Sequence, residues 1–179
     1  MSLPLPDGEP SDLDAVLVAR TVGGDRDALG LLYQRYAGRL TLLAARLLCG
    51  REDAEDVVQD LFVGLPETLA GYRDQGRLEG WLRRATVNLA LKRLRTASRR
   101  REEDLLSTTP CSPVSADSDA ILVRRAVESL PDSLRAVVIL KVVEGYSHTE
   151  IGELLGISRG ASEVRLTRAL EKLRQRIGE

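Results

Sequence analysis

Apolar residues recur at steps of three and four along most of the chain, the spacing that places them on one face of an α-helix. The first series predicts a helix that ends near Gly50 and consists of Leu29, Leu32, Tyr36, Leu40, Leu43 and Leu47. A second series consists of Val58, Leu61, Leu65 and Leu69, and Pro66 inside it predicts a kink or a break. A third helix is expected from about Leu78. Because no stretch alternates with a period of two residues, the pattern predicts an all-α fold.

The helical pattern stops between Glu102 and Asp119, where the sequence is EEDLLSTTPCSPVSADSD. This segment is rich in Ser, Thr, Pro and acidic residues and has little to bury, as is typical of a flexible linker. Fully extended, it reaches roughly 60 Å. We therefore expect two small helical domains, with an N-terminal extension over 1–25, a first domain over 26–101, the linker over 102–119 and a second domain over 120–179.

Glycines divide the last part of the chain, GYSHTEIGELLGISRGASEVRLTRAL, into short helices. Gly145 is expected at the left-handed position that ends a helix, and Ser147 with Glu150 forms the pattern of a capping box. Gly156 then ends a short helix, and Ser158 is expected to cap the next one. Helix, glycine turn and helix together predict a helix-turn-helix.

Three further positions near this motif carry expectations. Gly152 does not mark a helix end, and we interpret it as a site of close helix packing. The helix before the motif follows Leu130-Pro131, and Asp132 or Ser133 is expected to cap it.

The final helix has one apolar and one polar side on a helical wheel. The inward positions are expected to be Ser162, Leu166, Leu170, Leu173 and Ile177. The outward positions are expected to be Ala161, Val164, Arg165 and Arg168. A valine beside two arginines suits the major groove of DNA, where methyl groups, guanine edges and phosphates are accessible. The alternative is an ordinary helical hairpin with a solvated basic face, which Glu163 favours because an acid repels phosphate.

Charge is segregated along the chain. The net charge of −1 and the pI near 6.0 alone argue against a nucleic-acid-binding protein. However, the stretch from Arg83 to Arg101 holds eight basic residues and no acid, whereas Glu52 to Asp60 holds five acids and no base. The averages therefore hide two surfaces with different partners.

The basic stretch forms one stripe if the third helix is unbroken. Its members are Arg77, Trp81, Arg84, Asn88, Lys92, Arg95 and Arg99. Cations along a helix, an Asn that can pair with a base edge and a Trp that can stack are the groups needed to handle DNA backbone and unstacked bases. The alternative makes Trp81 a core residue and the arginines a solvated face.

The chain resembles the extracytoplasmic-function group of bacterial RNA polymerase sigma factors, in the sigma-70 family. In the first half the similar strings are DALGLLYQRYAGRL, REDAEDVVQDLF and GWLRRATVNLALKRLR. In the second half they are LPDSLRAVVILKVVEGYSHTEIGELLGIS and RLTRALEKLR. The resemblance implies a transcription initiation factor that binds core RNA polymerase, directs it to promoters and helps to melt the minus-10 region.

The resemblance also implies residue roles. The clamp helices of the beta-prime subunit would bind Asp56, Gln59, Asp60 and Phe62. The minus-10 element would be held by Arg77, Trp81, Arg84, Asn88, Lys92 and Arg95. The minus-35 element would be read by Ser158, Arg159, Ala161, Val164, Arg165 and Arg168, in a domain that also meets the beta flap. An anti-sigma factor is a further partner that the resemblance suggests.

Two other functions stay open at this point. A promoter-binding regulator that acts without polymerase would need the helix-turn-helix but not the acidic segment. An enzyme would need a metal at Glu52, Asp56 and Asp60, which share a helical face at steps of four, but no phosphate loop, nucleophile motif or zinc signature accompanies them. We expect no catalytic residue, metal or cofactor. We also expect a cytoplasmic protein without membrane insertion, because the sequence shows no signal segment and no apolar run of about 20 residues.

Overall fold

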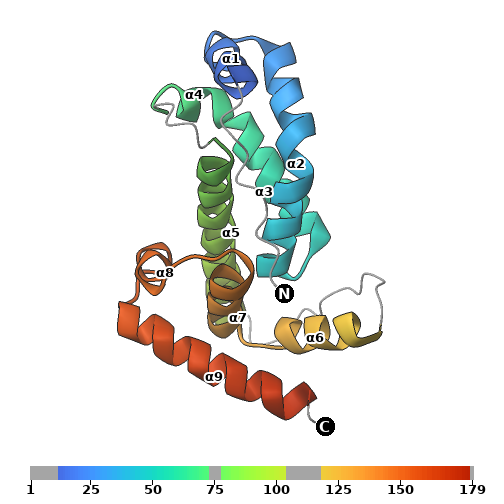
Figure 1. Cartoon of the computed structure of the whole chain (residues 1–179), viewed down its shortest axis with the longest axis vertical. Coiled ribbons are helices and arrows are strands. Elements are labelled where there is room, and N and C mark those ends of the chain that lie inside the picture. Colours follow the sequence, from blue (N-terminus) through green and yellow to red (C-terminus); the bar gives the residue numbers. More distant parts are fainter. Residues whose placement is uncertain (1–11, 73–77, 104–117, 178–179) are drawn as a thin grey trace.

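The computed structural model describes residues 12–72, 78–103 and 118–177, and within these ranges the ordered elements are all helical (Figure 1). The predicted all-α fold is therefore confirmed. Along the chain the elements are α1 (Asp12–Val22), α2 (Arg26–Leu48), α3 (Arg51–Val63), α4 (Leu65–Leu69), α5 (Leu78–Glu103), α6 (Ser118–Glu128), α7 (Asp132–Val138), the π-helical turn η1 (Ile139–Val143), α8 (His148–Leu155) and α9 (Arg159–Ile177). The greater part of the predicted linker, residues 104–117, lies outside the described residues.

The predicted helices of the first half are confirmed. Asp25 caps α2 by accepting hydrogen bonds from the backbone N–H groups of Asp27 and Ala28, at 2.9 and 3.2 Å. The expected break near Pro66 occurs at Gly64, and Pro66 lies in the first turn of α4, where its missing N–H costs nothing.

Helix α1 lies within the expected N-terminal extension and packs on the core. Leu17 and Val18 are buried in the same cluster as Leu32 and Phe62. The Tyr36 hydroxyl donates a 2.6 Å hydrogen bond to Asp14, which ties α1 to α2. The short apolar series of α1 was not recognised from the sequence, because its Leu and Val residues also occupy exposed positions such as Leu13 and Val16.

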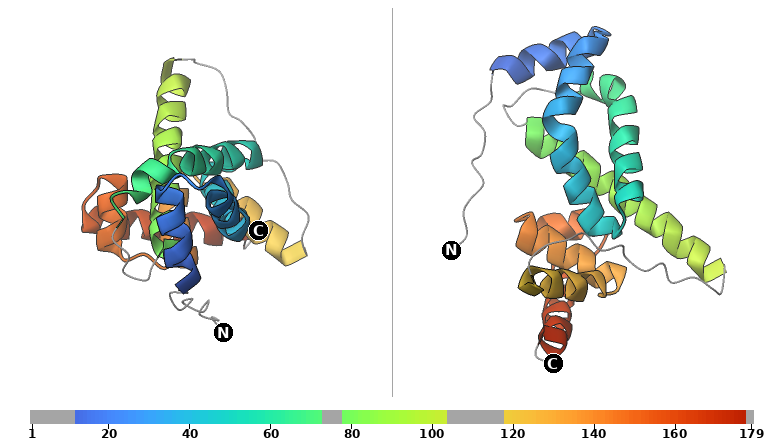
Figure 2. Two further views of the ribbon diagram at one scale, coloured as in Figure 1. Left: turned by 90° about the horizontal axis from the view of Figure 1, so that it is seen from above. Right: turned by 90° about the vertical axis from the view of Figure 1, so that its right-hand side faces the viewer.

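The helices form an elongated molecule (Figures 1 and 2). In the orientation of Figure 1, α1 and α4 lie at one end, α7, α8 and α9 lie at the other, and α5 extends from the first group toward the second. One buried cluster belongs to α1–α5, and another to α6, α7 and α9. A third cluster is shared by both halves, which pack directly on each other.

The helices of the helix-turn-helix end and are capped at the predicted residues. Gly145 and Gly156 adopt φ angles of 77° and 67°, in the left-handed region that glycine tolerates. Ser147 and Glu150 form the capping box, in which the Ser147 hydroxyl and N–H donate to the Glu150 carboxylate at 2.7 and 2.8 Å and lower the pKa of Glu150. The Ser158 hydroxyl accepts a hydrogen bond from the N–H of Ala161 at 3.1 Å and so caps α9.

One capping prediction is wrong. The residue at the N-cap of α7 is Pro131, and no side chain caps this helix end. Asp132 is in the first turn instead, where its carboxylate binds the guanidinium of Arg135 at 2.7 Å. The helix therefore begins one residue earlier than a cap at Asp132 requires.

The interpretation of Gly152 is confirmed, and it yields a stability prediction. A Cβ atom at Gly152 would lie 2.7 Å from the carbonyl oxygen of Ile157, a backbone atom that cannot move independently. Gly152→Ala is therefore expected to lower the free energy of unfolding by about 1–3 kcal/mol through overpacking. Urea denaturation followed by circular dichroism measures this change.

Gly160 provides the matched control, because a Cβ atom there would meet no atom within 4 Å apart from those of its chain neighbours and the adjacent backbone of its own helix. Gly160→Ala should leave stability unchanged or raise it by up to about 1 kcal/mol, since alanine favours the helix. Equal stability of the two variants would contradict the close packing at Gly152.

Candidate nucleic-acid interface

The outer face of α9 carries the side chains that the sequence placed outward. Val164 is 50% exposed, and Ser158, Arg159 and Arg168 are exposed as well. Ala161 and Arg165 are half-buried at the edge of this face. The face is therefore apolar at Val164 and cationic around it, as major-groove recognition requires.

The inward side of α9 differs in part from the prediction. Ser162 and Leu173 are buried and Leu166 is half-buried, as expected, but Leu170 and Ile177 are 37% and 50% exposed. The buried face is centred on Ala169, so Leu170 lies at its edge, and Ile177 is the last residue of the helix. The helical wheel predicted the direction of each side chain on α9. It could not predict which part of the helix is covered by the neighbouring helices.

Two polar contacts hold the start of α9. The Nδ1 atom of His148 lies 2.9 Å from the buried Ser162 hydroxyl and joins α8 to α9. Arg159 donates a 2.9 Å hydrogen bond to Glu163 and thereby lowers the pKa of that carboxyl group. Glu163 is thus ionised but paired, which weakens the phosphate repulsion that its position suggested.

Helix α5 presents the predicted basic stripe. Its exposed members are Arg84, Asn88, Lys92 and Arg95. Trp81 is half-buried, and its ring packs against Tyr72 with centroids 5.5 Å apart, so it also contributes to the core. Arg77 and the side chain of Arg99 lie outside the described residues.

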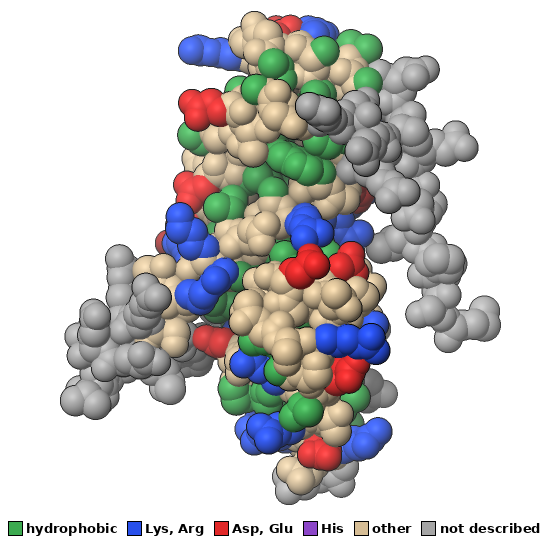
Figure 3. Space-filling model, turned by 90° about the vertical axis from the view of Figure 1, so that its left-hand side faces the viewer, with side chains coloured by type: hydrophobic (Ala, Val, Ile, Leu, Met, Phe, Trp, Pro, Cys, Tyr) green, Lys and Arg blue, Asp and Glu red, His purple; other side chains and the backbone are tan. Residues whose placement is uncertain are grey.

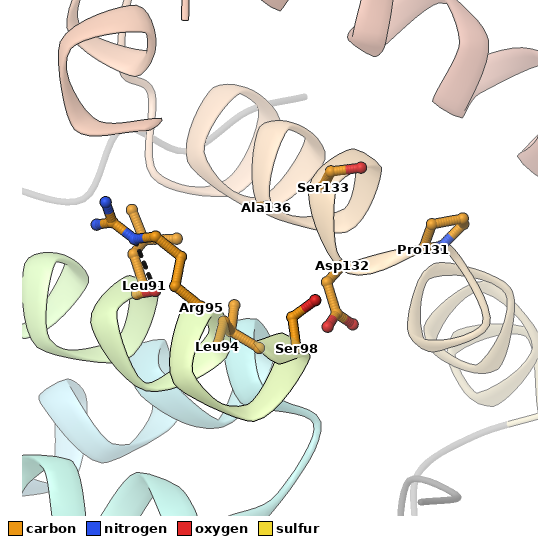
Figure 4. A pocket seen from close by; sticks show the side chains of 8 residues that line it. All are labelled: Leu91, Leu94, Arg95, Ser98, Pro131, Asp132, Ser133 and Ala136. Atoms are coloured by element: carbon orange, nitrogen blue, oxygen red, sulfur yellow. Dashed lines mark hydrogen bonds between the residues drawn. The ribbon is translucent and has the colours of Figure 1, made fainter. Parts of the chain in front are cut away.

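Two arginines of the stripe already have partners. Arg84 lies 3.3 Å from Glu153 of α8, and Arg95 donates to the carbonyl oxygen of Leu91 at 3.2 Å. Arg95 also lines a groove between α5 and α7 with a volume of about 560 Å³ (Figure 4). The sequence could not indicate the contact with Glu153, because it joins residues 69 positions apart.

The acidic face of α3 is exposed at Asp56, Gln59 and Asp60. Arg93 of α5 donates hydrogen bonds to Asp53 and Asp56, at 2.9 and 2.8 Å, and fixes part of this surface. Phe62, which was predicted to bind polymerase with these residues, is only 5% exposed and packs edge-on against Tyr33. Its aromatic ring faces α2 because the opposite side of α3 carries the acids.

The described residues contain no group of His, Cys, Asp or Glu side chains placed to hold a metal ion. Asp56 is paired with Arg93. The described helices also include none with the length and apolar character required to cross a membrane.

Comparison with known proteins assigns both halves. The model of sigma-70 region 2 matches residues 32–100, and that of sigma-70 region 4 matches residues 120–173. The ECF RNA polymerase sigma factor SigM of Mycobacterium tuberculosis is 33% identical over 166 residues, which cover 92% of this chain and 85% of SigM. The chain belongs to the extracytoplasmic-function group of the sigma-70 family. The RNA polymerase sigma factor CarQ of Myxococcus xanthus is 37% identical over 165 residues, 87% of this chain and 92% of CarQ.

Solved structures agree with this assignment. CnrH, in complex with the cytosolic domain of CnrY, has a TM-score of 0.54 and 27% identity over 92% of this chain and 96% of that chain. RpoE of Bartonella quintana, in complex with the anti-sigma factor NepR, has a TM-score of 0.66 at 20% identity over 83% of this chain and 96% of that one, which supports the fold. The chain is therefore a sigma factor that binds core RNA polymerase and promoter DNA. It is an initiation factor and not an enzyme.

Proposed function

We propose that the two halves of this sigma factor contact the two promoter elements separately. In this assignment residues 26–101 hold the minus-10 element through α5, residues 120–179 read the minus-35 element through α9, and residues 102–119 join them. The observation that carries the proposal is that α5 and α9 each expose a cationic face: Arg84, Asn88 and Lys92 on the first, Val164 and Arg168 on the second.

The two faces differ in chemistry. The face of α9 combines a valine with arginines and is suited to the edges of paired bases. The face of α5 combines cations, an exposed amide at Asn88 and the partly exposed Trp81, which suit phosphates and unstacked bases. A surface that binds splayed single strand better than duplex shifts the strand-opening equilibrium without hydrolysing anything.

Polymerase contacts are likewise assigned from an exposed charged face of one helix. The exposed acids Asp56 and Asp60, with Gln59 between them, form the surface for the clamp helices of beta-prime, while the second half meets the beta flap. Phe62 supports this surface from beneath. Both RpoE and CnrH were solved with partner proteins, so an anti-sigma factor is proposed here as well, with the cytoplasm as the place of action.

The assignment of α9 leads to a binding prediction. Arg165→Ala and Arg168→Ala are each expected to weaken binding of the polymerase holoenzyme to upstream promoter duplex, by about 1–3 kcal/mol if the contact is a bidentate one to a base. Fluorescence anisotropy with a labelled minus-35 duplex, selected beforehand from a genomic library, measures the loss.

The control variant is Arg174→Ala, which removes the same charge from an exposed position in the last turn of α9. This variant should reduce the affinity for the duplex far less, because Arg174 lies beyond the residues of α9 that are assigned to the minus-35 element. Equal losses in all three variants would show that only net charge matters, and unchanged affinity for Arg165→Ala and Arg168→Ala would refute the assignment.

A footprint of the holoenzyme on promoter DNA tests whether the two halves contact separate promoter elements. We expect protection of an upstream duplex segment and permanganate-reactive thymines in a separate downstream segment. Protection of a single contiguous duplex with no reactive thymines would contradict it.

A further inference from the structure

The first turns of α9 expose an acidic residue on the face that is assigned to the minus-35 element. Glu163 directly precedes Val164, and both side chains are exposed. On a helical wheel Glu163 and Arg168 lie on opposite sides of Val164, and Gly160, which has no side chain, lies between Glu163 and Val164. Figure 3 shows the side of the molecule on which α9 begins, and basic and acidic side chains lie next to one another in its lower half. A duplex that approaches this face therefore meets a carboxylate as well as cations.

Arg159 binds one oxygen of this carboxylate. Its Nε atom donates a hydrogen bond to Oε1 of Glu163 at 2.9 Å, while the two side chains stay 72% and 46% exposed. The hydrogen bond holds the pKa of Glu163 below its usual range, so the carboxyl group is ionised at neutral pH. An ionised carboxylate has about four acceptor sites on its two oxygens. Glu163 is thus held in place by Arg159 and can still accept a hydrogen bond from a ligand.

Helix stability gives little reason for this ion pair. Exposed ion pairs contribute little to stability, and on a helix they are weaker when the cation precedes the acid, as it does here. Arg159 is also the first residue of α9, where the helix dipole disfavours a cation. The pair therefore has the less favourable order, at the end of the helix that is assigned to DNA.

The two charged groups together match the major-groove edge of a G·C base pair. That edge presents two acceptors, N7 and O6 of guanine, followed by one donor, the N4 amino group of cytosine. Because the Nε atom of Arg159 binds Glu163, its terminal Nη1 and Nη2 atoms provide the further donors of the guanidinium. Two donors and one acceptor on the protein are thus complementary to two acceptors and one donor on the base pair.

An A·T base pair fits this arrangement less well. It places the amino group of adenine between two acceptors, N7 of adenine and O4 of thymine, and these acceptors repel a carboxylate. A guanine base facing the carboxylate presents only acceptors on this edge. An acid at this position therefore distinguishes base pairs by repelling the wrong edges as well as by binding the right one.

We propose that Glu163 is a specificity-determining residue that accepts a hydrogen bond from the N4 amino group of a cytosine in the minus-35 element, while Arg159 binds the guanine of the same base pair. The inference rests on the proposed assignment of α9 to the minus-35 element. Phosphates repel the acid on every duplex, and a duplex with this base pair offsets the repulsion by a direct contact. Glu163 therefore contributes to the choice of promoter more than to the affinity for DNA.

The test uses the holoenzyme of core polymerase and the full-length chain, with the selected minus-35 duplex and every single base-pair replacement in it. Fluorescence anisotropy should identify one G·C pair whose replacement by A·T weakens binding by the wild type about 5- to 100-fold. Glu163→Gln is expected to shift the preference at this position from cytosine toward adenine, because an amide pairs with N6 and N7 of adenine. The preferences at the other positions should stay as in the wild type.

Two further variants separate base recognition from net charge. Glu171→Gln removes an exposed acid further along the same helix and should leave the preference at every position unchanged. Arg159→Gln should reduce the discrimination at the same base pair as Glu163→Gln, since the two residues contact one pair. Circular dichroism verifies that each variant keeps its helical content.

The role of Glu163 is refuted if Glu163→Gln changes the affinity for all duplexes by one common factor, as removal of any acid near phosphates would. It is also refuted if Arg159→Gln alters the preference at a different position, or if the position that responds to Glu163→Gln is not a G·C pair in the wild-type element. Failure of the proposed function has another signature, because then no base-pair replacement in the upstream duplex changes binding by the wild type. That result removes both proposals, whereas an element that is read without any response to Glu163→Gln removes only the role of Glu163.

Discussion

Replacing Arg135 with methionine is expected to lower the free energy of unfolding by about 2–5 kcal/mol. The guanidinium binds the carbonyl oxygens of Leu47 and Leu130 and the carboxylate of Asp132. Methionine fills much of the volume but leaves buried acceptors unsatisfied, each at a cost of about 1–3 kcal/mol. Urea denaturation at neutral pH measures the change.

Arg125→Met is the matched control, since Arg125 is exposed on α6 and its replacement leaves no buried group without a partner. Its stability should stay within about 0.5 kcal/mol of the wild type, as for most surface substitutions. If both variants unfold at the same urea concentration, the buried guanidinium does not hold the halves together as described.

The second large effect is expected on polymerase binding. Asp56→Arg reverses a charge on the acidic face of α3 and places a second cation next to Arg93. An acidic docking face is complementary to a basic surface on polymerase, so an arginine at position 56 would face like charges across the interface. Such a juxtaposition costs several kcal/mol, and the affinity for core polymerase should fall by at least about 30-fold. Competition with a labelled reference sigma factor measures the loss.

Glu67→Arg serves as the control, because it makes the same charge reversal at an exposed position of α4, outside the acidic face. It should bind core polymerase like the wild type, and both variants should keep their helical content. Normal core binding by Asp56→Arg would refute the docking assignment.

Local rules were sufficient to predict much of the fold. The left-handed glycines at 145 and 156, the capping box at Ser147 and the break near Pro66 depend on residues close in sequence. Each of them acts through the backbone within one or two helical turns, so the sequence determines them before any tertiary contact forms. The same holds for the direction of the stripe on α5.

Long-range packing explains what the sequence could not indicate. Arg135 stands in the apolar run LRAVVILK and has the pattern of a solvated position, yet it is buried because the end of α2 provides an acceptor 88 residues away in sequence. Glu144 is buried for the same reason, by arginines 98 and 61 residues away. The burial of Phe62 against Tyr33 likewise depends on how α3 lies on α2.

The polar sites also divide into those that depend on one helix and those that depend on contacts between distant helices. The sequence identified the exposed residues of α5 and α9 because they form continuous stripes on single helices. It did not identify Glu144 as a partner of Arg83, or Glu153 as a partner of Arg84, because these are single acids far away in sequence. These ion pairs became visible only with both halves in one structure.

Transcription in vitro with purified core polymerase and a library of genomic fragments tests the central claim most directly. Core enzyme with this chain should produce discrete transcripts that are absent with core enzyme alone and with the Asp56→Arg variant. If the wild-type chain neither associates with core polymerase nor starts any transcript, it does not act as a sigma factor.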